Sequence, residues 1–599
     1  MKIAFNSRRV SKGTIELTTM ADKQEDFFAQ FQTPPVDEAK LRGGYYTPGE
    51  IAEWLCRWAI RSADDTVLEP SCGNGEFLLA AAQRLTKLGA SRRCIANQLV
   101  GIEIIAREAS EAQRNLSRFL TNRAESVVAC RDFFIWEAEN PKALYRCVVG
   151  NPPFIRYQQF PEPSRSLAMS AMERLGLHPN RLTNAWVPFV ACSVAHLAPG
   201  GRIAIVLPAE LLQVSYAAQL RRFLTEHFKT IDIIACNSLL FDRAEQEVVL
   251  VVAQGRCEPA LLKGACSIDL LEVSHLNQVR PEDLLPSSRP RRRKKVNHES
   301  EKWLKYFLTP REIDFMREIR RTATVGTLSE HASVDVGVVT GKNKYFVLSA
   351  EETQRFGLKN QCLAHLVGRS AHLRGASLTK EEFRELATRG ESVFLFYVKP
   401  ALSTPLPQAV KSYIALGLQA KVHKGYKCSI RDPWYSVPSV WAPDCFLFRQ
   451  IYDFPRMVVN LTDATSTDTI HRVKCIGDPA LVASNAYTHL TAASAEIEGR
   501  SYGGGVLELE PSEAENLLIP RKLQAGLPIS EIDSLVRRGK LDAALEKNDK
   551  LILVRALGLS SRECALLRRI WVKMRDRRIN RKKHPENGQS CGGSPLYRS

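Results

Sequence analysis

The 599-residue chain lacks an apolar run long enough to span a bilayer, and its polar N-terminus lacks a secretory hydrophobic core. Its fifteen cysteines are scattered, with no C-x-x-C pair and no Cys/His cluster at zinc spacing. Internal repeats and Ser/His/Asp or Cys/His nucleophile arrangements are also missing. These absences argue against membrane insertion, bound metal and covalent catalysis, and they predict reduced thiols in a cytoplasmic protein.

Acidic residues are scarce relative to basic ones. Lys and Arg number 83 against 65 Asp and Glu, which gives a formal net charge of +18. Such an excess favours a polyanionic partner such as a nucleic acid. The hydrophobic content of 44% is an ordinary globular value, and the length predicts several domains.

Short apolar strands alternate with helical patterns between about residues 66 and 253. This order predicts an α/β fold with a doubly wound, mostly parallel, Rossmann-like sheet, in which ligands bind at the carboxyl ends of the strands. Residues able to bind a ligand follow several of those ends. The expected strands are 66–69, 99–103, 126–133, 147–150, 202–208, 231–235 and 247–253.

The first strand leads into the turn Gly73-Asn74-Gly75, ahead of a helix that begins near Phe77. Glycines there let the backbone approach a ligand closely, and a helix N-terminus favours a negative group. The turn lacks the third glycine of the dinucleotide-binding fingerprint. Upstream, Thr47 is placed to cap a helix whose first turn holds Pro48 and Glu50, and this helix start also offers N–H groups to a carboxylate ligand.

Acidic residues follow the second and third strands. Glu103 ends the second strand, where a carboxylate typically binds the two hydroxyls of a ribose; the alternative is an acidic helix N-cap. Asp132 can accept a hydrogen bond from the exocyclic amine of an adenine, and Phe133 can pack on the purine. For Asp132, an ordinary turn residue is the alternative.

The fourth strand ends in Asn151-Pro152-Pro153-Phe154. The prolines fix the backbone and donate no N–H, so their carbonyls remain able to accept hydrogen bonds. An asparagine oxygen beside such a carbonyl can bind both hydrogens of a planar NH₂ group and direct the nitrogen lone pair towards an electrophile. Phe154 offers an aromatic face to the ring that carries the amine. The alternative is a proline-rich turn that closes a buried strand.

In this order, the motifs resemble those of the gamma-class DNA adenine methyltransferases of type II restriction–modification systems. The resemblance covers about residues 40–255 and rests on Tyr45 to Pro48, Glu69 to Phe77, Gly101 to Glu103, Arg131 to Phe134 and Gly150 to Phe154. It implies methyl transfer from S-adenosylmethionine to the N6 amine of an adenine rotated out of duplex DNA. That transfer is an in-line displacement, which depends on positioning more than on acid–base catalysis.

The resemblance assigns roles to the matched residues. The implied cofactor-binding residues are Thr47, Glu69, Ser71, Gly73, Gly75, Glu103, Asp132 and Phe133. Asn151 and the carbonyl of Pro152 would bind the target amine, and Phe154, where tyrosine is commoner in the family, would stack on the flipped base. Phe241 would make a second contact to that base, or else be an apolar core residue. Cys72 is interpreted as a packing residue, because cytosine carbon-5 enzymes place their cysteine after a proline at the target-base site.

The composition changes between residues 281 and 300, where prolines and serines precede a basic run of Arg291, Arg292, Arg293, Lys294 and Lys295. This run predicts an inter-domain linker that contacts DNA phosphates, with a merely solvated run as the alternative. Residues 301–525 interleave basic and aromatic residues among turn signals, which suits phosphate and base-edge contacts. Gly337 to Asn343 resembles the start of the target-recognition domain of the same enzymes. Lys342, Lys424 and Lys427 are further DNA-contact candidates.

The C-terminal pattern is helical and basic, and it ends in Arg575, Arg577, Arg578, Arg581, Lys582 and Lys583. The last fifteen residues are expected to be disordered and to add non-specific DNA affinity. The predicted organisation is an N-terminal arm (1–40), a methyltransferase domain (41–280), a basic linker (281–300), a mixed α+β target-recognition domain (301–525) and a helical basic C-terminal segment (526–599).

The leading hypothesis is a site-specific N6-adenine DNA methyltransferase that acts as a monomer on double-stranded DNA and protects it from a cognate restriction endonuclease. The alternatives in the same chemistry are methylation of cytosine N4, of an RNA base or of a protein glutamine. A fused nuclease has too little room in the short stretch before Tyr45, and an intact Asn151 argues against a non-catalytic DNA-binding subunit. Recognition domains diverge with their targets, so the sequence does not predict which bases are read.

Overall fold

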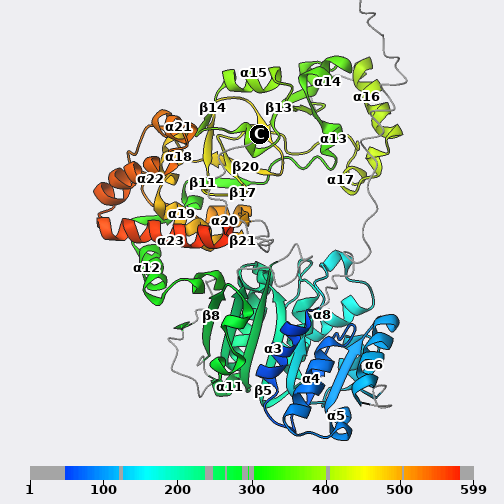
Figure 1. The fold of residues 1–599 in the computed structure, drawn as a ribbon. Helices are drawn as coiled ribbons and strands as arrows, with labels where there is room; N and C mark the ends of the chain where they lie inside the picture. Colours follow the sequence, from blue (N-terminus) through cyan, green and yellow to red (C-terminus); the bar gives the residue numbers. More distant parts are fainter. Residues whose placement is uncertain are drawn as a thin grey trace, which may run out of the picture.

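The structure is a computed structural model, and it describes residues 47–120, 126–236, 247–262, 266–285, 294–295, 302–399, 405–501 and 505–580. The predicted arm at 1–40, Phe241, Arg291 to Arg293 and the last fifteen residues lie outside the described residues. The described part of the chain forms an N-terminal lobe and a C-terminal lobe, one above the other in Figure 1.

The N-terminal lobe is built on a sheet that, within the described residues, has nine strands in the order β3-β2-β1-β4-β5-β7-β6-β8-β9. The first five strands in this order are parallel to one another, whereas β7 is antiparallel to both β5 and β6. This arrangement confirms the prediction of a doubly wound, mostly parallel sheet. The strands are β1 (Val67–Glu69), β2 (Leu99–Glu103), β3 (Val128–Cys130), β4 (Tyr145–Gly150), β5 (Leu197–Pro208), β6 (Phe228–Cys236), β7 (Val248–Arg256), β8 (Ser267–Val273) and β9 (Lys294–Lys295).

Helices cover both faces of this sheet because its strands are buried on both sides. Along β4, Val148 belongs to one hydrophobic core while Cys147 and Val149 belong to the other, as expected when successive strand residues point to opposite faces. One face carries α3 (Gly49–Ala59), α4 (Glu76–Lys87), α5 (Arg92–Gln98) and α6 (Ala106–Leu120). The other face carries α7 (Phe133–Glu139), α8 (Ser164–Arg174), α9 (Trp186–Ala195) and α10 (Ala218–His227).

The sheet extends beyond the strands predicted from the sequence. Strand β8 alternates apolar and polar residues and pairs in parallel with β6. Lys294 and Lys295 form β9, which pairs with Ile268 and Ser267 of β8. The basic run was predicted to be a linker, but these two lysines complete the edge of the sheet because β8 offers backbone groups for pairing.

The C-terminal lobe is a mixed α/β structure with two cores. One core surrounds the sheet β11-β20-β16-β18-β14, and the other surrounds the sheet β12-β15-β13-β19. The strands of the lobe are β10 (Val325–Thr327), β11 (Ala332–Asp335), β12 (Val347–Leu348), β13 (Leu363–Val367), β14 (Ser377–Leu378), β15 (Phe394–Phe396), β16 (Cys445–Phe448), β17 (Gln450–Ile451), β18 (Met457–Asn460), β19 (Thr465–Ser466), β20 (Ile470–Cys475), β21 (Arg500–Ser501), β22 (Leu507–Glu508) and β23 (Leu518–Pro520).

The helices of the second half lie around these sheets and between the lobes (Figure 1). They are α12 (Pro310–Arg321), α13 (Asn343–Phe346), α14 (Ala350–Arg355), α15 (Lys380–Thr388), α16 (Gln408–Gln419), α17 (Tyr426–Ser429), α18 (Pro479–Ala486), α19 (His489–Glu498), α20 (Pro511–Glu515), α21 (Ile529–Arg537), α22 (Leu541–Asp549) and α23 (Ser561–Ile579). The short helix α11 (Pro259–Leu262) belongs to the N-terminal lobe. A π-helical stretch, Lys550–Ala556, continues α22.

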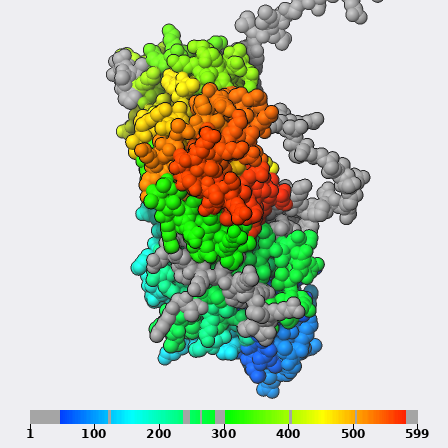
Figure 2. All heavy atoms as spheres, turned by 90° about the vertical axis from the view of Figure 1, so that its left-hand side faces the viewer, coloured from blue at the N-terminus to red at the C-terminus, as the bar shows by residue number. Residues whose placement is uncertain are grey.

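The last described helix, α23, packs between the lobes rather than extending into solvent. Figure 2 shows the orange and red C-terminal helices against the green residues that follow the N-terminal lobe. Arg577 of α23 places its Nε atom 2.7 Å from Glu272 of β8, and its guanidinium lies over the ring of Phe307. Arg578 pairs with Glu496 at 2.6 Å, with both side chains buried. The basic C-terminal segment therefore includes two arginines that are buried in ion pairs within the protein.

Candidate functional site

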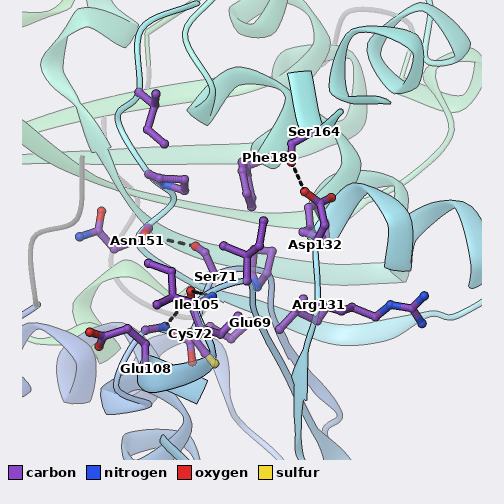
Figure 3. Close-up of a pocket in the computed structure, with 18 of the residues that line it drawn as sticks. Glu69, Ser71, Cys72, Ile105, Glu108, Arg131, Asp132, Asn151, Ser164 and Phe189 are labelled. Carbon is purple, nitrogen blue, oxygen red and sulfur yellow. Dashed lines mark hydrogen bonds between the residues drawn. The ribbon is translucent and has the colours of Figure 1, made fainter. Parts of the chain in front are cut away.

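A cavity of about 790 Å³ opens at the carboxyl ends of β1, β2, β3 and β4. Most of the sequence-predicted residues of the N-terminal lobe meet there. Figure 3 shows Asn151 on one side of the cavity and Asp132 on the other, with Phe189 between them. The predicted residues that line the cavity are Thr47, Glu69, Ser71, Gly73, Glu103, Asp132, Phe133 and Asn151.

Asn151 is fixed in place by two neighbours from distant parts of the chain. Its side-chain Nδ2 atom donates a hydrogen bond to Thr47 Oγ1 at 3.2 Å. The hydroxyl of Ser71 donates to the backbone carbonyl of Asn151 at 3.3 Å. The bond to Thr47 orients the side-chain amide, and the bond from Ser71 holds the backbone of the same residue.

The sequence predicted that Thr47 caps the helix, but in the structure it does not. Pro48 occupies the N-cap position of α3, and no side chain caps the helix. The hydroxyl of Thr47 is instead directed at Asn151, 104 residues away in the sequence. The spacing of Thr47 and Glu50 predicted a local capping contact. In the structure, Thr47 instead contacts a residue far along the chain.

The glycine turn and Glu103 are joined by backbone hydrogen bonds. The N–H of Gly73 donates to Glu103 Oε2 at 2.9 Å, and the N–H of Ile105 donates to Oε1 at 2.8 Å. Gly73 has a φ of +49° and open space where a Cβ would lie. The turn thus brings backbone to the cavity wall beside a carboxylate, as predicted.

Gly75 has a packing role and does not line the cavity. Its φ is +86°, and a Cβ there would lie 2.9 Å from the Cβ of Ala112 on α6. Glycine is therefore required for the close approach of α4 and α6. Its predicted direct contact with the cofactor is not supported by this placement.

Asp132 is both a helix cap and a cavity residue. One carboxylate oxygen accepts hydrogen bonds from the N–H groups of Phe134 and Ile135 at 2.7 and 3.1 Å, and the other accepts one from the hydroxyl of Ser164. Phe133 stacks on Phe189 with ring centroids 5.2 Å apart. For Asp132 the sequence left an ordinary turn residue as the alternative; in the structure its carboxylate caps α7, and an aromatic wall stands beside it.

Acidic side chains dominate the charge of the cavity. Burial raises the pKa of Glu69 well above its ordinary value, and the nearby Glu103 raises it further. Burial also raises the pKa of Glu103 despite the opposing hydrogen bonds from Ile105 and Gly73. Within the described residues, Glu69 Oε2 is buried without a hydrogen-bond partner. A cationic ligand fits such a site, since it would compensate both carboxylates.

The remaining side chains of the Asn-Pro-Pro-Phe motif lie beside the cavity rather than in its wall. Pro153 lines it, whereas Pro152 is buried and Phe154 is half-buried against the larger hydrophobic core. The structure therefore brings Asn151 to the cavity but does not place the ring of Phe154 there. Phe241, the second predicted base contact, lies outside the described residues.

The sequence did not single out several cavity residues contributed by helices. Phe189 comes from α9, Ser164 from α8 and Phe160 from the segment between them and β4. No local motif marks these residues, because they reach the cavity only through the packing of α8 and α9 against α7. The aromatic contact between Phe189 and Phe133 carries no local sequence signal.

Cys72 lies in the cavity wall but has the properties of a packing residue. Its side chain is buried, and a Cβ on Gly101 would lie 3.3 Å from its Sγ. Burial raises the pKa of its thiol well above the ordinary value, so the thiolate needed for nucleophilic attack is disfavoured. In the described part of the chain, no group of three or more His, Cys, Asp or Glu side chains could hold a metal ion. No helix there is long and apolar enough to cross a membrane.

Two family models match the two halves of the chain. Residues 19–284 match N-6 DNA Methylase, and residues 300–553 match the C-terminal domain of Type II methyltransferase M.Eco57I. The first match contains every cavity residue described above.

Curated relatives resemble the chain over most of its length. Type II methyltransferase M.AccI of Acinetobacter calcoaceticus is 23% identical over 80% of this chain and 85% of the relative. Type II methyltransferase M.XamI of Xanthomonas campestris pv. amaranthicola is 25% identical over 80% of this chain and 86% of the relative. The solved structure of the Type IIL restriction–modification enzyme MmeI in complex with DNA has a similar fold, with a TM-score of 0.53, 13% identity, and coverage of 93% of this chain and 77% of that chain.

Fold, site and sequence matches define the class: this is an S-adenosylmethionine-dependent DNA methyltransferase. More particularly, the chain is an N6-adenine DNA methyltransferase of type II restriction–modification systems. Its cofactor, S-adenosylmethionine, carries a positive sulfonium and an ammonium group, which suits a cavity lined by buried carboxylates.

Proposed function

We propose that this enzyme is a gamma-class methyltransferase that modifies one adenine within a specific duplex DNA site, after that base has rotated out of the helix. The order of the motifs supports the class, since the glycine turn precedes Asn151 and the C-terminal lobe follows both. The observation that carries the proposal is the amide of Asn151, which is oriented by Thr47 at the wall of the acidic cavity.

The cofactor would lie along the carboxyl ends of β1, β2 and β3, and it supplies a methyl group activated on a sulfonium. Glu69 and Glu103 would compensate the positive charge, and Glu103 would also bind the ribose hydroxyls. Ser71 and Gly73 present a hydroxyl and backbone at the methionine end. Asp132 and Phe133 would hold the adenine ring, with Phe189 behind it.

Asn151 would position the target amine. Its Nδ2 donates to Thr47, which leaves the amide oxygen as the acceptor for an amine hydrogen, with the carbonyl of Pro152 as the second acceptor. These two hydrogen bonds would turn the nitrogen lone pair towards the methyl group, and the displacement then depends on alignment rather than on a strong base. We also propose that Phe154 and Phe241 contact the flipped base. For Phe154 this requires its half-buried ring to turn towards the cavity when DNA binds.

We also propose how the two lobes divide their roles and in which setting the enzyme acts. The N-terminal lobe would perform the chemistry and residues 301–525 would read the DNA, with the basic run near 291–295 and Lys342, Lys424 and Lys427 on phosphates. The enzyme would act as a monomer in the cytoplasm, where its DNA substrate is found, and would protect that DNA from a cognate restriction endonuclease. The names of the relatives, which are type II methyltransferases, support this setting.

The test is a labelled methyl-transfer assay combined with one substitution. We expect Asn151→Ala to abolish formation of N6-methyladenine, a loss of at least about 100-fold, while S-adenosylmethionine and DNA bind as in the wild type. Methylation is measured with labelled S-adenosylmethionine and duplex DNA, and cofactor affinity by calorimetry.

The matched control is Asn140→Ala. Asn140 is the C-cap residue of α7, and among the described residues its side chain bonds only to the carbonyl of Trp136 in the same helix turn. A near-normal rate for Asn151→Ala would show that Asn151 does not have the proposed role. Loss of cofactor binding in that variant would instead assign Asn151 to the cofactor.

A further inference from the structure

Two segments of the C-terminal lobe meet at the end that carries α13, α16 and α17. Nη1 of Arg431 donates to the carbonyl of Thr340 at 2.9 Å, and Nη2 donates to the carbonyl of Val339 at 2.6 Å. Gly341 has a φ of +86°, and a Cβ there would lie 2.8 Å from the Cβ of Lys427. We call the joined segments 339–343 and 424–431 the tip. Its backbone is held by these internal contacts.

The tip exposes large apolar side chains that no other described element covers. Tyr426 is 74% exposed and Ile430 is 64% exposed. They are four residues apart across one helical turn and therefore lie on the same face. Val339 and Leu418 nearby are also exposed, at 38% and 44%. A group of exposed apolar side chains on one rigid element marks an interaction site.

Positive charge surrounds this apolar group. The sequence contains no acidic residue between Glu391 and Asp432. Within that stretch, Lys421, Lys424 and Lys427 form no ion pair with a described residue. The Nζ atom of Lys427 lies 5.6 Å from the ring centroid of Tyr426. An apolar group inside a purely basic stretch complements a polyanion that also offers apolar surface, and duplex DNA has both properties.

The position of the tip agrees with a DNA partner. In Figure 1, α17 lies on the same side of the molecule as α8, whose residue Ser164 lines the cavity. The apolar group named above consists of four side chains, whereas a stable protein interface takes about 20–30 residues and about 800 Å² from each partner. A contact with a few base pairs requires much less apolar area.

We propose that the tip enters a groove of the substrate DNA, where Tyr426 and Ile430 touch base edges while Lys424 and Lys427 hold the flanking phosphates. This rests on the proposed function and adds to it a specificity-determining pair of residues. Apolar contact with base edges, such as thymine methyl groups, discriminates between sequences, whereas phosphate contacts do not.

The experiment compares two duplexes, one containing the site that the wild type methylates and one with the same composition in scrambled order. For Tyr426→Ala and Ile430→Ala, we expect kcat/KM on the methylated site to fall by about tenfold or more, with unchanged affinity for the scrambled duplex. Lys427→Ala should weaken binding to both duplexes and reduce the slope of log affinity against log salt by about one.

Matched controls separate this proposal from general damage. Tyr426→Phe should keep the wild-type rate, and so should Leu261→Ala, which removes a side chain that is 77% exposed in the other lobe. Thermal unfolding checks that each variant is folded. If Tyr426→Ala weakened the action on both duplexes equally, or left kcat/KM on the methylated site unchanged, the proposed base contact would be overturned. The proposed function would remain intact in either case. Methylation by the wild type without sequence preference would overturn both.

Discussion

Glu69 occupies the end of β1, with 2% of its surface exposed and its Oε2 atom without a hydrogen-bond partner among the described residues. Burial raises the pKa of this carboxyl in the folded state above its value in the unfolded chain. The folded protein consequently binds more protons than the unfolded one between those two pKa values. The free energy of unfolding therefore falls as pH rises through this window, because burial costs the ionised carboxylate more than its hydrogen bond from the backbone of Leu78 returns.

We predict that Glu69→Gln stabilises the cofactor-free protein at pH 8 and weakens its binding of S-adenosylmethionine. The stability difference should shrink at lower pH, where the wild-type carboxyl is protonated. Thermal unfolding at pH 5 and pH 8 measures the first effect, and calorimetric titration the second. Glu53→Gln on α3 is the control, because that side chain is largely exposed and should change neither quantity. A less stable Glu69→Gln protein at pH 8 would contradict the argument.

For single residues, the sequence predicted which side chains lie at strand ends better than it predicted what each residue contacts. Glu103, Asp132 and Asn151 were placed correctly, because the carboxyl ends of parallel strands meet at one edge. Gly75 was assigned to the ligand, although its reason for being glycine is Ala112 on a neighbouring helix. A glycine in a turn before a helix has the same local appearance in both cases, so only tertiary packing distinguishes them.

Among the elements, α23 shows that a basic sequence pattern does not reveal whether its arginines are exposed or buried. The sequence predicted a helical, basic segment without indicating which arginines are buried, and Arg577 proves to be 5% exposed and to face Glu272, about 300 residues earlier in the chain. Burial lowers the pKa of Arg577 to about 10, although Glu272 opposes this shift. No local feature of the sequence connects these two residues. Strand β9 was missed for a similar reason, since its pairing partner β8 lies before the proline-rich segment.

We predict that Arg577→Ala lowers the free energy of unfolding by about 2–4 kcal/mol, because it leaves Glu272 and Glu247 without their buried partner. Denaturant unfolding measures the change. Arg568→Ala on the same helix removes an exposed arginine with only long ion pairs and should alter stability by about 0.5 kcal/mol or less. Equal effects for the two variants would mean that α23 does not depend on the buried pair.

On the scale of the whole molecule, the two lobes share one of their hydrophobic cores. The same cluster contains Leu212 beside the sheet, Trp303 and Phe307 after the basic run, and Trp571 of α23. A reciprocal pair of hydrogen bonds joins Gln213 to the backbone of Ser501. The predicted boundaries near 300 and 525 therefore separate sequence patterns, but they do not separate independent cores.

A fragment ending at residue 300 should consequently expose apolar surface that Trp303 and Phe307 cover in the full chain. We predict that residues 1–300 alone bind a hydrophobic dye and unfold at a lower temperature than the full chain, which should unfold in one transition. Scanning calorimetry and dye fluorescence of both proteins provide the measurement. Two separate transitions in the full chain, one of them matching the fragment, would show instead that the lobes are independent.

The construction of the tip has a consequence for how such enzymes diverge. Arg431 and Gly341 hold its backbone, whereas Tyr426, Ile430, Lys424 and Lys427 project from it with little part in its stability. Substitutions at these four positions are therefore nearly neutral for folding and are open to selection for what they touch. A lineage can in this way acquire a new DNA preference by point mutation at the tip while the catalytic lobe remains under purifying selection.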